Sequence, residues 1–403
     1  MCYFEIYERA FCVCIRDSIK KKKTDIAGYA SSKNLFCKKA IRNMKKIMLY
    51  INAIHDGGAE RVMVNLAKYF SENGYDTTLV TSFRDTWEYP LASTVRRLTL
   101  EETEIKQSRI KRNVSRIKKL RDLCKSEKPD ILVSFMEEPN FRAILATRGL
   151  PVKTLVSVRN DPKKEYAGKL GAFVGRVLLP MANGCVFQTK EAQEWFPQKL
   201  QKKSRIIYNA VKEEFYHIER KPNRGEIVTC GRLTEQKNHA MLISAFAKVV
   251  EQYPYATLKI YGEGSLRGAL QGQIDAAGLS GKVFLMGSTN DVGKALQTAD
   301  VFVLSSDYEG MPNALMEAMA VGAPCVSTDC PCGGPKDLFG EALTNQLVPV
   351  NDAEALKKAV HIFLNMPEHD KDQIGIEMKS RAMDFRPEII NKKWLDYLKE
   401  IVG

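Results

Sequence analysis

Residues 301–332 read VFVLSSDYEGMPNALMEAMAVGAPCVSTDCPC, and this stretch decides the fold. Residues 301–304 form an apolar run rich in β-branched and aromatic side chains, which predicts a buried strand that ends in a polar loop. Gly310 lets the backbone turn sharply, and Pro312 suits a helix start because its missing N–H would be unpaired there. Good helix formers follow over residues 313–321. The sequence therefore predicts a strand, a tight loop and a helix, which is the repeating unit of a parallel α/β sheet.

The loop before this helix predicts an anion-binding site. The free N–H groups and the positive dipole end at residues 312–315 point out of the carboxyl end of a strand, where open α/β sheets bind ligands. Glu309 precedes the helix, and Glu317 lies inside it, roughly 7 Å from its start at 1.5 Å per residue. Glu317 can accept hydrogen bonds from vicinal hydroxyls such as those of a ribose, and Glu309 can reach hydroxyls beyond the phosphates. A solvated helix carboxylate is the alternative for Glu317, which the Gly and Pro between the two glutamates disfavour.

Length and charge restrict the class of protein. A chain of 403 residues exceeds what one hydrophobic core usually serves, so two domains are expected. The net charge of +13 indicates a polyanionic partner, which can be a nucleic acid, an anionic membrane surface or a phosphorylated substrate. Ten cysteines without a signal peptide indicate reduced, cytosolic thiols. No stretch reaches the roughly 20 apolar residues of a membrane-spanning helix, so any membrane contact is expected at the surface.

Residues 1–43 do not resemble part of a folded domain. They have no clear periodicity, and they carry +6 of the net charge, from ten basic and four acidic residues. We expect a disordered extension or an over-long gene prediction before a natural start at Met44. A basic arm that binds membranes is the alternative.

Strand and helix patterns alternate after Met44, as in a mostly parallel sheet covered on both faces. The predicted strands are residues 46–52, 77–83, 130–135, 152–158 and 206–208. At the first strand-to-helix turn, Gly57 and Gly58 can bring backbone N–H groups against a phosphate or a sugar. The sequence has no G-x-G-x-x-G motif, which argues against a dinucleotide oxidoreductase.

Residues 105–128 predict an amphipathic helix with a basic face. Its apolar side is expected to hold Ile110, Val114, Ile117, Leu120 and Cys124. Ten cations against two acids favour contact with anionic lipid headgroups, each cation contributing about 1 kcal/mol near a charged bilayer. A solvated face is the alternative. The cations are Lys106, Arg109, Lys111, Arg112, Arg116, Lys118, Lys119, Arg121, Lys125 and Lys128.

Two loops that follow strands, residues 135–140 and 157–162, are expected to line a cleft between the domains. In the second loop, Arg159 can either stabilise developing negative charge or pair with Asp161. Asn160 and, after the strand at 206–208, Asn209 are further candidates for this cleft.

In the second half of the chain, a strand over residues 226–230 precedes Arg232 and Lys237. These two cations can converge on one diphosphate, Arg through a two-pronged contact and Lys as a point charge. Gly262 follows the strand at 258–261 and predicts a tight turn near the nucleotide. No metal is expected, because Cys325, Cys330 and Cys332 have no fourth ligand nearby and the Asp-x-Asp at 370–372 stands in a solvated region. Later apolar residues at helical spacing predict a last helix over 387–402.

From Met44 to the C-terminus, the chain resembles the retaining glycosyltransferases of family 4. Glu309 and Glu317 match that family's motif EG-x-P-x-x-x-x-E, and the other motifs above fall in the family's order. The resemblance implies a GT-B fold of two facing Rossmann-like domains. Its expected parts are an acceptor-side domain at 44–212, a nucleotide-sugar domain at 213–385 and a helix at 386–403 that crosses back onto the first domain.

The resemblance also implies a reaction. It is the metal-independent, retaining transfer of a UDP-linked hexose or N-acetylhexosamine to a glycan or polyprenyl-phosphate-linked acceptor, in bacterial surface polysaccharide assembly. The implied place is the cytoplasmic face of the cell membrane, with no cofactor and no nucleic acid. Many relatives present a histidine where this chain has Arg159 and Asn160. The implied catalytic residues are Glu309, Arg232 and Lys237, and the implied donor-binding residues are Glu317, Gly310, Met311, Pro312, Asn313, Ala314, Gly57, Gly58 and Gly262.

Two other functions remain open at this stage. A sugar-nucleotide epimerase with the same fold would bind the same donor and need no acceptor. A basic nucleic-acid-binding protein would fit the net charge, but the sequence shows no recognised nucleic-acid module.

Overall fold

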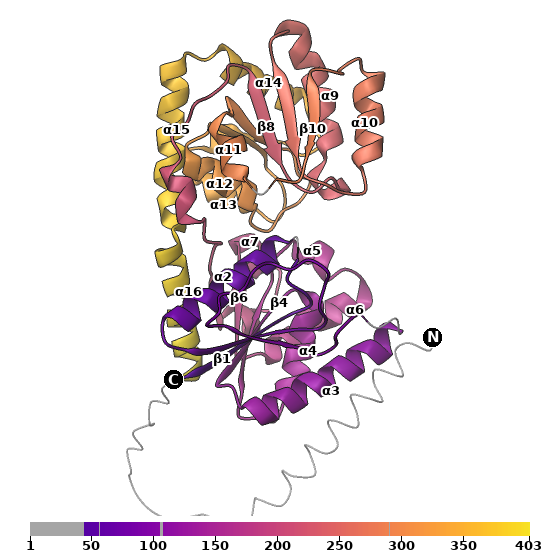
Figure 1. Cartoon of the computed structure of the whole chain (residues 1–403), viewed down its shortest axis with the longest axis vertical. Coiled ribbons are helices and arrows are strands. Elements are labelled where there is room, and N and C mark those ends of the chain that lie inside the picture. The colour runs from indigo at the N-terminus through magenta and orange to yellow at the C-terminus, as the bar shows by residue number, and fades with distance from the viewer. Residues whose placement is uncertain (1–43, 56, 105–107, 290) are drawn as a thin grey trace, which may run out of the picture. The chain divides into compact units, whose positions relative to one another are not determined.

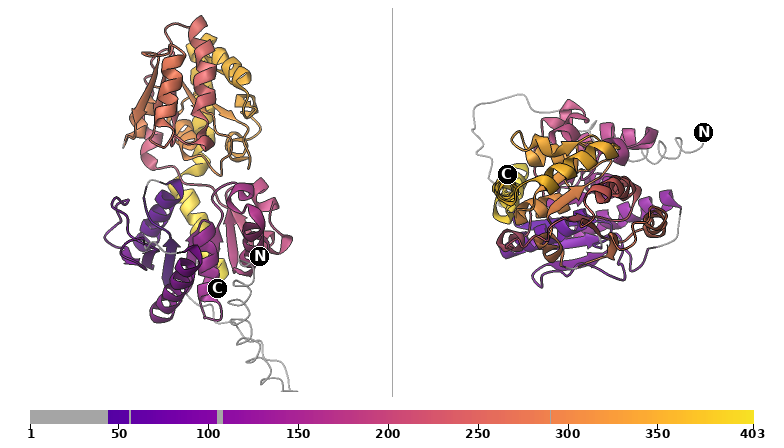
Figure 2. Two further views of the ribbon diagram at one scale, coloured as in Figure 1. Left: turned by 90° about the vertical axis from the view of Figure 1, so that its right-hand side faces the viewer. Right: turned by 90° about the horizontal axis from the view of Figure 1, so that it is seen from above.

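The structure is a computed structural model that describes residues 44–55, 57–104, 108–289 and 291–403. The predictions for residues 1–43 and for Lys106 lie outside the described residues. Two parallel β-sheets with helices on their faces organise the described chain (Figures 1 and 2). We refer to the part built on each sheet as the N-lobe and the C-lobe.

The N-lobe sheet has seven strands in the order β3-β2-β1-β4-β5-β6-β7, and all neighbouring strands are parallel. The order reverses between β1 and β4, and the carboxyl ends of strands beside such a reversal are where these sheets bind ligands. The strands are β1 Lys46–Ile51, β2 Asp76–Thr81, β3 Arg96–Thr99, β4 Ile131–Phe135, β5 Lys153–Ser157, β6 Gly184–Phe187 and β7 Ser204–Ile206.

The C-lobe sheet has six parallel strands in the order β10-β9-β8-β11-β12-β13, and its order reverses between β8 and β11. Arg232 follows β8 and Glu309 follows β11, so both leave the sheet at this reversal. The strands are β8 Glu226–Cys230, β9 Thr257–Tyr261, β10 Val283–Gly287, β11 Val301–Leu304, β12 Cys325–Thr328 and β13 Leu347–Val348.

Helices cover the sheets. The α-helices of the N-lobe are α2 Gly58–Glu72, α3 Arg109–Glu127, α4 Glu137–Thr147, α5 Pro162–Glu165, α6 Gly168–Phe173, α7 Lys190–Glu194 and α8 Gln198–Gln201. The α-helices that follow in the chain are α9 His239–Gln252, α10 Arg267–Ala276, α11 Val292–Gln297, α12 Asn313–Val321, α13 Gly334–Phe339, α14 Ala353–Asn365, α15 Glu368–Ala382 and α16 Pro387–Val402. Short 3₁₀ or π segments are η1 Val174–Leu178, η2 Leu179–Met181, η3 Glu213–His217, η4 Glu235–Lys237, η5 Thr344–Gln346 and η6 Met383–Phe385. None of these helices has the length and the apolar content needed to cross a membrane.

The buried strands of the N-lobe separate two cores because successive side chains point to opposite faces. Met48 and Tyr50 of β1 lie in one buried cluster with Leu120 of α3. Leu49, between them, lies in another cluster with Trp394 of α16. Both faces of the sheet are therefore covered, as parallel sheets require.

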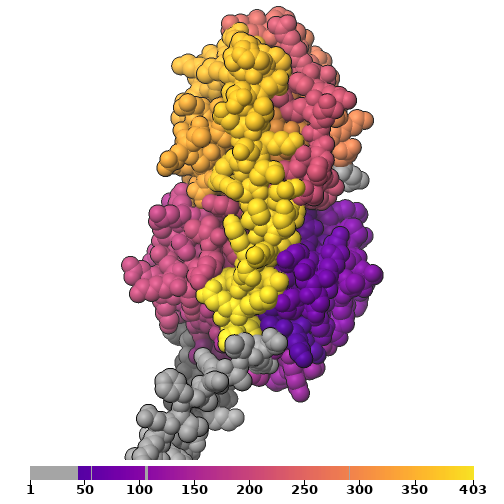
Figure 3. Space-filling model, turned by 90° about the vertical axis from the view of Figure 1, so that its left-hand side faces the viewer, coloured from indigo at the N-terminus to yellow at the C-terminus, as the bar shows by residue number. Residues whose placement is uncertain are grey.

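Helix α16 has the predicted bounds and crosses back onto the N-lobe (Figure 3). Trp394 is fully buried, and its ring centre is 5.5 Å from that of Phe135 in β4. The Tyr397 hydroxyl accepts a hydrogen bond from the Cys185 N–H at 3.2 Å and donates one to the Lys203 carbonyl at 2.6 Å. These contacts confirm the predicted crossover helix.

The predicted apolar face of α3 is confirmed for Leu120 and Cys124, which are buried, and is wrong for Val114 and for Arg116. Arg116, expected on the basic outer face, is buried, and its Nη2 lies 2.8 Å from Oε2 of the equally buried Glu101. Val114, expected inside, is 56% exposed. The face of α3 that carries Arg116 turns inward, because the ion pair with Glu101 fills part of the space that a continuous apolar stripe would otherwise fill. Apolar periodicity alone does not indicate such a pair.

Both aspartates of the Asp-x-Asp at residues 370–372 are exposed, as predicted, but the residue between them is not. Lys371 is buried, and its Nζ lies 2.5 Å from Oδ1 of Asp300. Asp300 Oδ2 accepts a hydrogen bond from the Gly225 N–H at 2.7 Å. The motif therefore helps to fasten α15 to the start of the C-lobe sheet.

Candidate active site

A cleft of about 1200 Å³ lies between the two lobes. Every residue predicted for the site lines it, from Gly57 and Gly58 in the N-lobe to Gly262 and the segment 309–314 in the C-lobe. Arg159, Asn160, Asn209, Arg232, Lys237 and Glu317 complete that set. The structure thus brings the predicted residues together, and their roles in binding and catalysis stay predictions.

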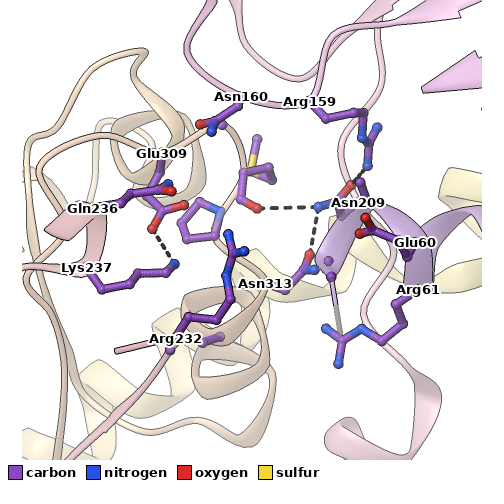
Figure 4. A pocket seen from close by; sticks show the side chains of 18 of the residues that line it. Glu60, Arg61, Arg159, Asn160, Asn209, Arg232, Gln236, Lys237, Glu309 and Asn313 are labelled. Atoms are coloured by element: carbon purple, nitrogen blue, oxygen red, sulfur yellow. Dashed lines mark hydrogen bonds and ion pairs between the residues drawn. The ribbon is translucent and has the colours of Figure 1, made fainter. Parts of the chain in front are cut away.

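Glu309 is held in the loop between β11 and α12. Its side chain is buried, and its Oε1 accepts hydrogen bonds from Lys237 Nζ at 2.5 Å and from the Ser306 hydroxyl at 2.7 Å (Figure 4). Its backbone N–H donates to the Pro331 carbonyl at 2.8 Å, and the Cys332 thiol donates to the Glu309 carbonyl at 3.3 Å. The loop after β12 therefore fixes the backbone that presents this carboxylate.

The cysteines in that loop have a structural use. Cys330 and Cys332 are buried, and burial raises the pKa of the Cys332 thiol to about 12, so the thiol stays protonated and can donate its hydrogen bond. Within the described ranges, no three His, Cys, Asp or Glu side chains lie where they could hold a metal ion together.

Glu317 of α12 contacts a residue that the sequence analysis did not single out for the site. Its carboxylate is buried, and Oε1 lies 2.5 Å from Nη2 of Arg61 in α2. Burial raises the pKa of Glu317, and the positive charge of Arg61 opposes that rise. The position of Arg61, in the first turn of the helix after the paired glycines, could have marked it as a site residue. Its partner Glu317 is 256 residues away in the chain, and no sequence pattern connects the two.

Glycines let the two lobes approach. A Cβ on Gly58 would lie 2.7 Å from Nδ2 of Asn313, and one on Gly310 would lie 2.3 Å from the Arg159 carbonyl oxygen. Real Cβ atoms do not come this close to other heavy atoms. Packing between lobes therefore explains Gly310, which meets backbone, whereas the close atom at Gly58 is the end of a side chain.

Asn209 connects the lobes through its side chain. Its Oδ1 accepts hydrogen bonds from Arg159 Nη2 and, at 2.9 Å, from Gln188 Nε2, both in the N-lobe (Figure 4). Its Nδ2 donates to Asn313 Oδ1 at 2.7 Å and to the Met311 carbonyl at 3.4 Å, both at the start of α12. The predicted cleft residue is thus the centre of a hydrogen-bond network between lobes.

Arg159 does not pair with Asp161. Its guanidinium lies 4.5 Å from the ring centre of Phe135, and burial lowers its pKa to about 9. Asp161 instead caps α5, where its Oδ1 accepts a hydrogen bond from the Lys163 N–H at 2.9 Å. Of the two predictions for Arg159, pairing with Asp161 is wrong, and a role for Arg159 in stabilising negative charge stays a prediction.

Arg232 and Lys237 stand on the C-lobe wall of the cleft near the start of α12 (Figure 4). Lys237 is committed to Glu309, whereas the exposed Arg232 side chain forms no ion pair or hydrogen bond with the described residues. Gly262 lies behind them, where a Cβ would be 2.0 Å from the Gly231 carbonyl oxygen. A cationic wall and a helix start facing one cavity are suited to a diphosphate.

Comparison with known proteins identifies the class that this fold and cleft define. Residues 56–215 match the family profile Glycosyltransferase Family 4, and residues 211–377 match the profile Glycosyl transferases group 1. The chain therefore carries a family 4-type and a group 1-type glycosyltransferase domain in succession, and it is a glycosyltransferase.

One curated relative is the GalNAc-alpha-(1->4)-GalNAc-alpha-(1->3)-diNAcBac-PP-undecaprenol alpha-1,4-N-acetyl-D-galactosaminyltransferase of Campylobacter jejuni. It is 26% identical over 367 residues, which is 89% of this chain and 99% of the relative. Among solved structures, sucrose-phosphate synthase from Thermosynechococcus elongatus has a TM-score of 0.77 at 17% identity, covering 89% of this chain and 99% of that one. Anabaena HepE in complex with UDP and glucose has a TM-score of 0.73 at 17% identity, covering 88% and 100%. These structural likenesses establish the GT-B fold.

Proposed function

We propose that this glycosyltransferase transfers a sugar from a UDP-sugar to the sugar of a lipid-linked glycan, with retention of the anomeric configuration and without a metal. The observation that carries the proposal is the C-lobe wall. There the start of α12, the free Arg232, Lys237 and the buried Glu317 all line one cleft.

The donor has a matching group for each of these features. The diphosphate takes the backbone N–H groups of residues 313 and 314 at the start of α12, together with Arg232 and Lys237. The ribose hydroxyls donate to Glu317, and the transferred sugar lies against Glu309. The UDP bound to Anabaena HepE, a protein of the same fold, supports UDP as the nucleotide, and the undecaprenol-linked substrate named for the Campylobacter relative supports a lipid-linked acceptor.

In this proposal, catalysis is electrostatic. Arg232 and Lys237 stabilise the negative charge that grows on the departing UDP, which replaces the role a divalent cation has in other transferases. Glu309 is already bonded to Lys237 and Ser306, so we propose that it positions the donor sugar and does not attack it. The acceptor hydroxyl then attacks the face that UDP leaves, and a phosphate oxygen takes its proton.

A panel of nucleotide-sugars tests this function. We expect UDP-sugars to raise the thermal unfolding temperature most, because a ligand at 100 times its Kd stabilises the folded state by about 2.7 kcal/mol. With the best donor and a lipid-linked acceptor, NMR of the product should show the anomeric configuration of the donor. Stabilisation by no nucleotide-sugar would contradict donor binding, and an inverted product would contradict retention.

The same samples test the two alternatives. An epimerase would convert the donor to its epimer without any acceptor, and we expect the donor to stay unchanged. Retention of DNA that survives competition by UDP would indicate a nucleic-acid-binding protein, and we expect none at physiological salt.

We further propose that the enzyme binds the anionic cytoplasmic face of the membrane through α3. Several of its cations have carboxylate partners, such as Arg109 with Glu138 at 2.9 Å and Arg112 with Glu104 at 3.3 Å. An outward stripe remains, formed by the exposed Lys111, Val114 and Lys118. Cations on either side of an apolar residue suit an anionic lipid surface.

Lys111→Gln with Lys118→Gln should weaken binding to anionic vesicles. At about 1 kcal/mol for each lysine, the partition coefficient should fall about 30-fold at low salt, as co-sedimentation with phosphatidylserine vesicles can measure. The matched control is Lys392→Gln with Lys393→Gln, two exposed lysines of α16, for which we expect no loss. Equal binding by both double variants, or no binding by the unmodified enzyme, would contradict a membrane role for α3.

A further inference from the structure

A buried carboxyl group on the N-lobe wall of the cleft has no use in the donor site. Glu165 Oε2 is buried without a hydrogen-bond partner among the described residues, and Arg159 Nε is in the same state. Both residues line the cleft, and Glu165 as a whole is half-buried. Leaving a buried polar group unpaired costs about 1–3 kcal/mol, so two such atoms on one wall indicate a place that a polar ligand completes.

The local fold holds Glu165 firmly. It is the last residue of α5, which starts at Pro162 and is capped by Asp161. Its carboxyl group lies near the backbone N–H groups of Glu137, Arg159 and Asn160, which follow the carboxyl ends of β4 and β5, but none of them forms a hydrogen bond with Oε2. The side chain is thus fixed at the edge of the sheet where ligands bind.

The surroundings keep Glu165 neutral. Burial raises the pKa of Glu165 to about 8, the charge of Glu137 adds to the rise, and the three backbone N–H groups oppose it. At pH 7 the carboxyl group is mostly protonated and can donate a hydrogen bond. The titratable groups that interact with it from the packed elements are Glu137 at the start of α4, Arg159 after β5, Tyr166 after α5 and Cys185 in β6.

We propose that Glu165 and Arg159 bind a hydroxyl group of the acceptor's terminal sugar, an inference that rests on the proposed transferase function. A protonated carboxyl donates and accepts, and Arg159 Nε donates, so a hydroxyl, which does both, satisfies the pair. A phosphate group only accepts hydrogen bonds. It would be repelled by the negative charge that Glu165 gains when its carboxyl group loses its proton as pH rises. A neutral sugar is therefore the ligand class that this wall selects.

The place of the wall assigns it to the acceptor and not to the donor. The features that suit the nucleotide stand on the C-lobe, whereas Glu165 belongs to the N-lobe. The wall nevertheless borders the donor-sugar region, because the Arg159 carbonyl oxygen would be 2.3 Å from a Cβ on Gly310, and Lys164 Nζ is 5.4 Å from the ring centre of Tyr308. Tyr308 and Gly310 flank Glu309. A hydroxyl held at Glu165 thus belongs to a sugar lying against the proposed donor sugar.

The experiment measures sugar binding directly. The probes are the methyl α-glycosides of N-acetylgalactosamine and glucose, titrated by saturation-transfer NMR into enzyme saturated with UDP. Glu165→Ala should weaken the binding of the better glycoside about 10-fold at pH 7, because it removes one buried hydrogen-bonding group. Glu165→Gln, which keeps a neutral donor of the same shape, should retain most of the affinity. Glu194→Gln, an exposed change on α7, is the matched control.

The pH dependence separates this role from mere packing. Between pH 7 and 8, the unmodified enzyme should lose glycoside affinity because Glu165 loses the proton that it donates, whereas Glu165→Gln should not. The comparison ends at pH 8 because Arg159, whose pKa burial lowers to about 9, also loses its proton above it. UDP affinity, measured by calorimetry, should stay within about twofold in every variant. No UDP binding by the unmodified enzyme would count against the proposed function, whereas its loss only in a Glu165 variant would place Glu165 in the donor site and overturn the inference. The inference is overturned if Glu165→Ala binds the glycosides like the unmodified enzyme, if Glu165→Gln shows the same loss between pH 7 and 8, or if the unmodified enzyme binds neither glycoside.

Discussion

Glu317→Ala should weaken UDP binding about 100-fold. The ribose is proposed to donate two hydrogen bonds to this buried carboxylate, and a hydrogen bond to a charged group contributes about 1.5–3 kcal/mol. Two such bonds at the lower limit give about 3 kcal/mol, and each 1.4 kcal/mol is tenfold in Kd. Calorimetric titration of UDP measures the change. UDP affinity within a few-fold of the unmodified enzyme would remove Glu317 from the donor site.

Arg61 gives this prediction a pH dependence. Burial raises the pKa of Glu317, and Arg61, 2.5 Å away, opposes the rise. UDP affinity should therefore fall as the pH drops through the pKa of Glu317, because the protonated carboxyl accepts hydrogen bonds less strongly. In Arg61→Gln the pKa of Glu317 should rise further, so this loss should begin at a higher pH.

Two comparisons complete this test. Glu317→Ala should show no such acidic loss of UDP affinity, since it lacks the titrating group. An Arg61→Gln profile that coincides with that of the unmodified enzyme would mean that the contact between lobes does not control the carboxylate. Thermal unfolding without ligand separates either effect from a loss of folded protein.

The elements with a strong local pattern were predictable from sequence. Strand β11 and helices α12 and α16 have the predicted bounds, because an apolar run, a Gly or Pro boundary and helical spacing are all local signals. Strands β12 and β13 were not predicted, since β13 has only two residues and β12 stands between the Gly-Ala-Pro helix boundary and a Pro- and Gly-rich turn. The predicted site residues line one cleft, because most of them lie in loops that follow the carboxyl ends of strands.

Contacts between distant segments were not predictable in the same way. Arg61 and Glu317 are 256 residues apart, and each reads locally as an ordinary charged residue on a helix. Arg116 was assigned to the outer face of α3 because nothing near it indicates Glu101 as a buried partner. Glu165 was not considered for the site, since its significance comes from burial and from a missing partner, which only the folded chain shows.

Arg232→Ala should lower kcat about 100-fold with little change in stability. Removing one group that stabilises charge in a transition state costs about 10²–10³ in kcat. Arg232 is exposed in the cleft and bonds to none of the described residues, so the folded state loses no contact that the structure shows. Arg232→Lys should recover only part of the rate, because an ammonium group does not make the two-pronged contact with a diphosphate. Initial rates of UDP release in the presence of acceptor measure both.

Lys237→Ala should show a similar loss of kcat together with a lower unfolding temperature. Lys237 is the ion-pair partner of Glu309, which is only 6% exposed, and removing it leaves a buried carboxylate with the Ser306 hydroxyl as its side-chain partner. Breaking a buried pair in this way is strongly destabilising. Arg267→Ala, which removes an equal charge from α10 outside the cleft, should leave kcat within about twofold. If Arg232→Ala and Lys237→Ala behaved like Arg267→Ala, the C-lobe wall would not be the site where the leaving group's charge is stabilised.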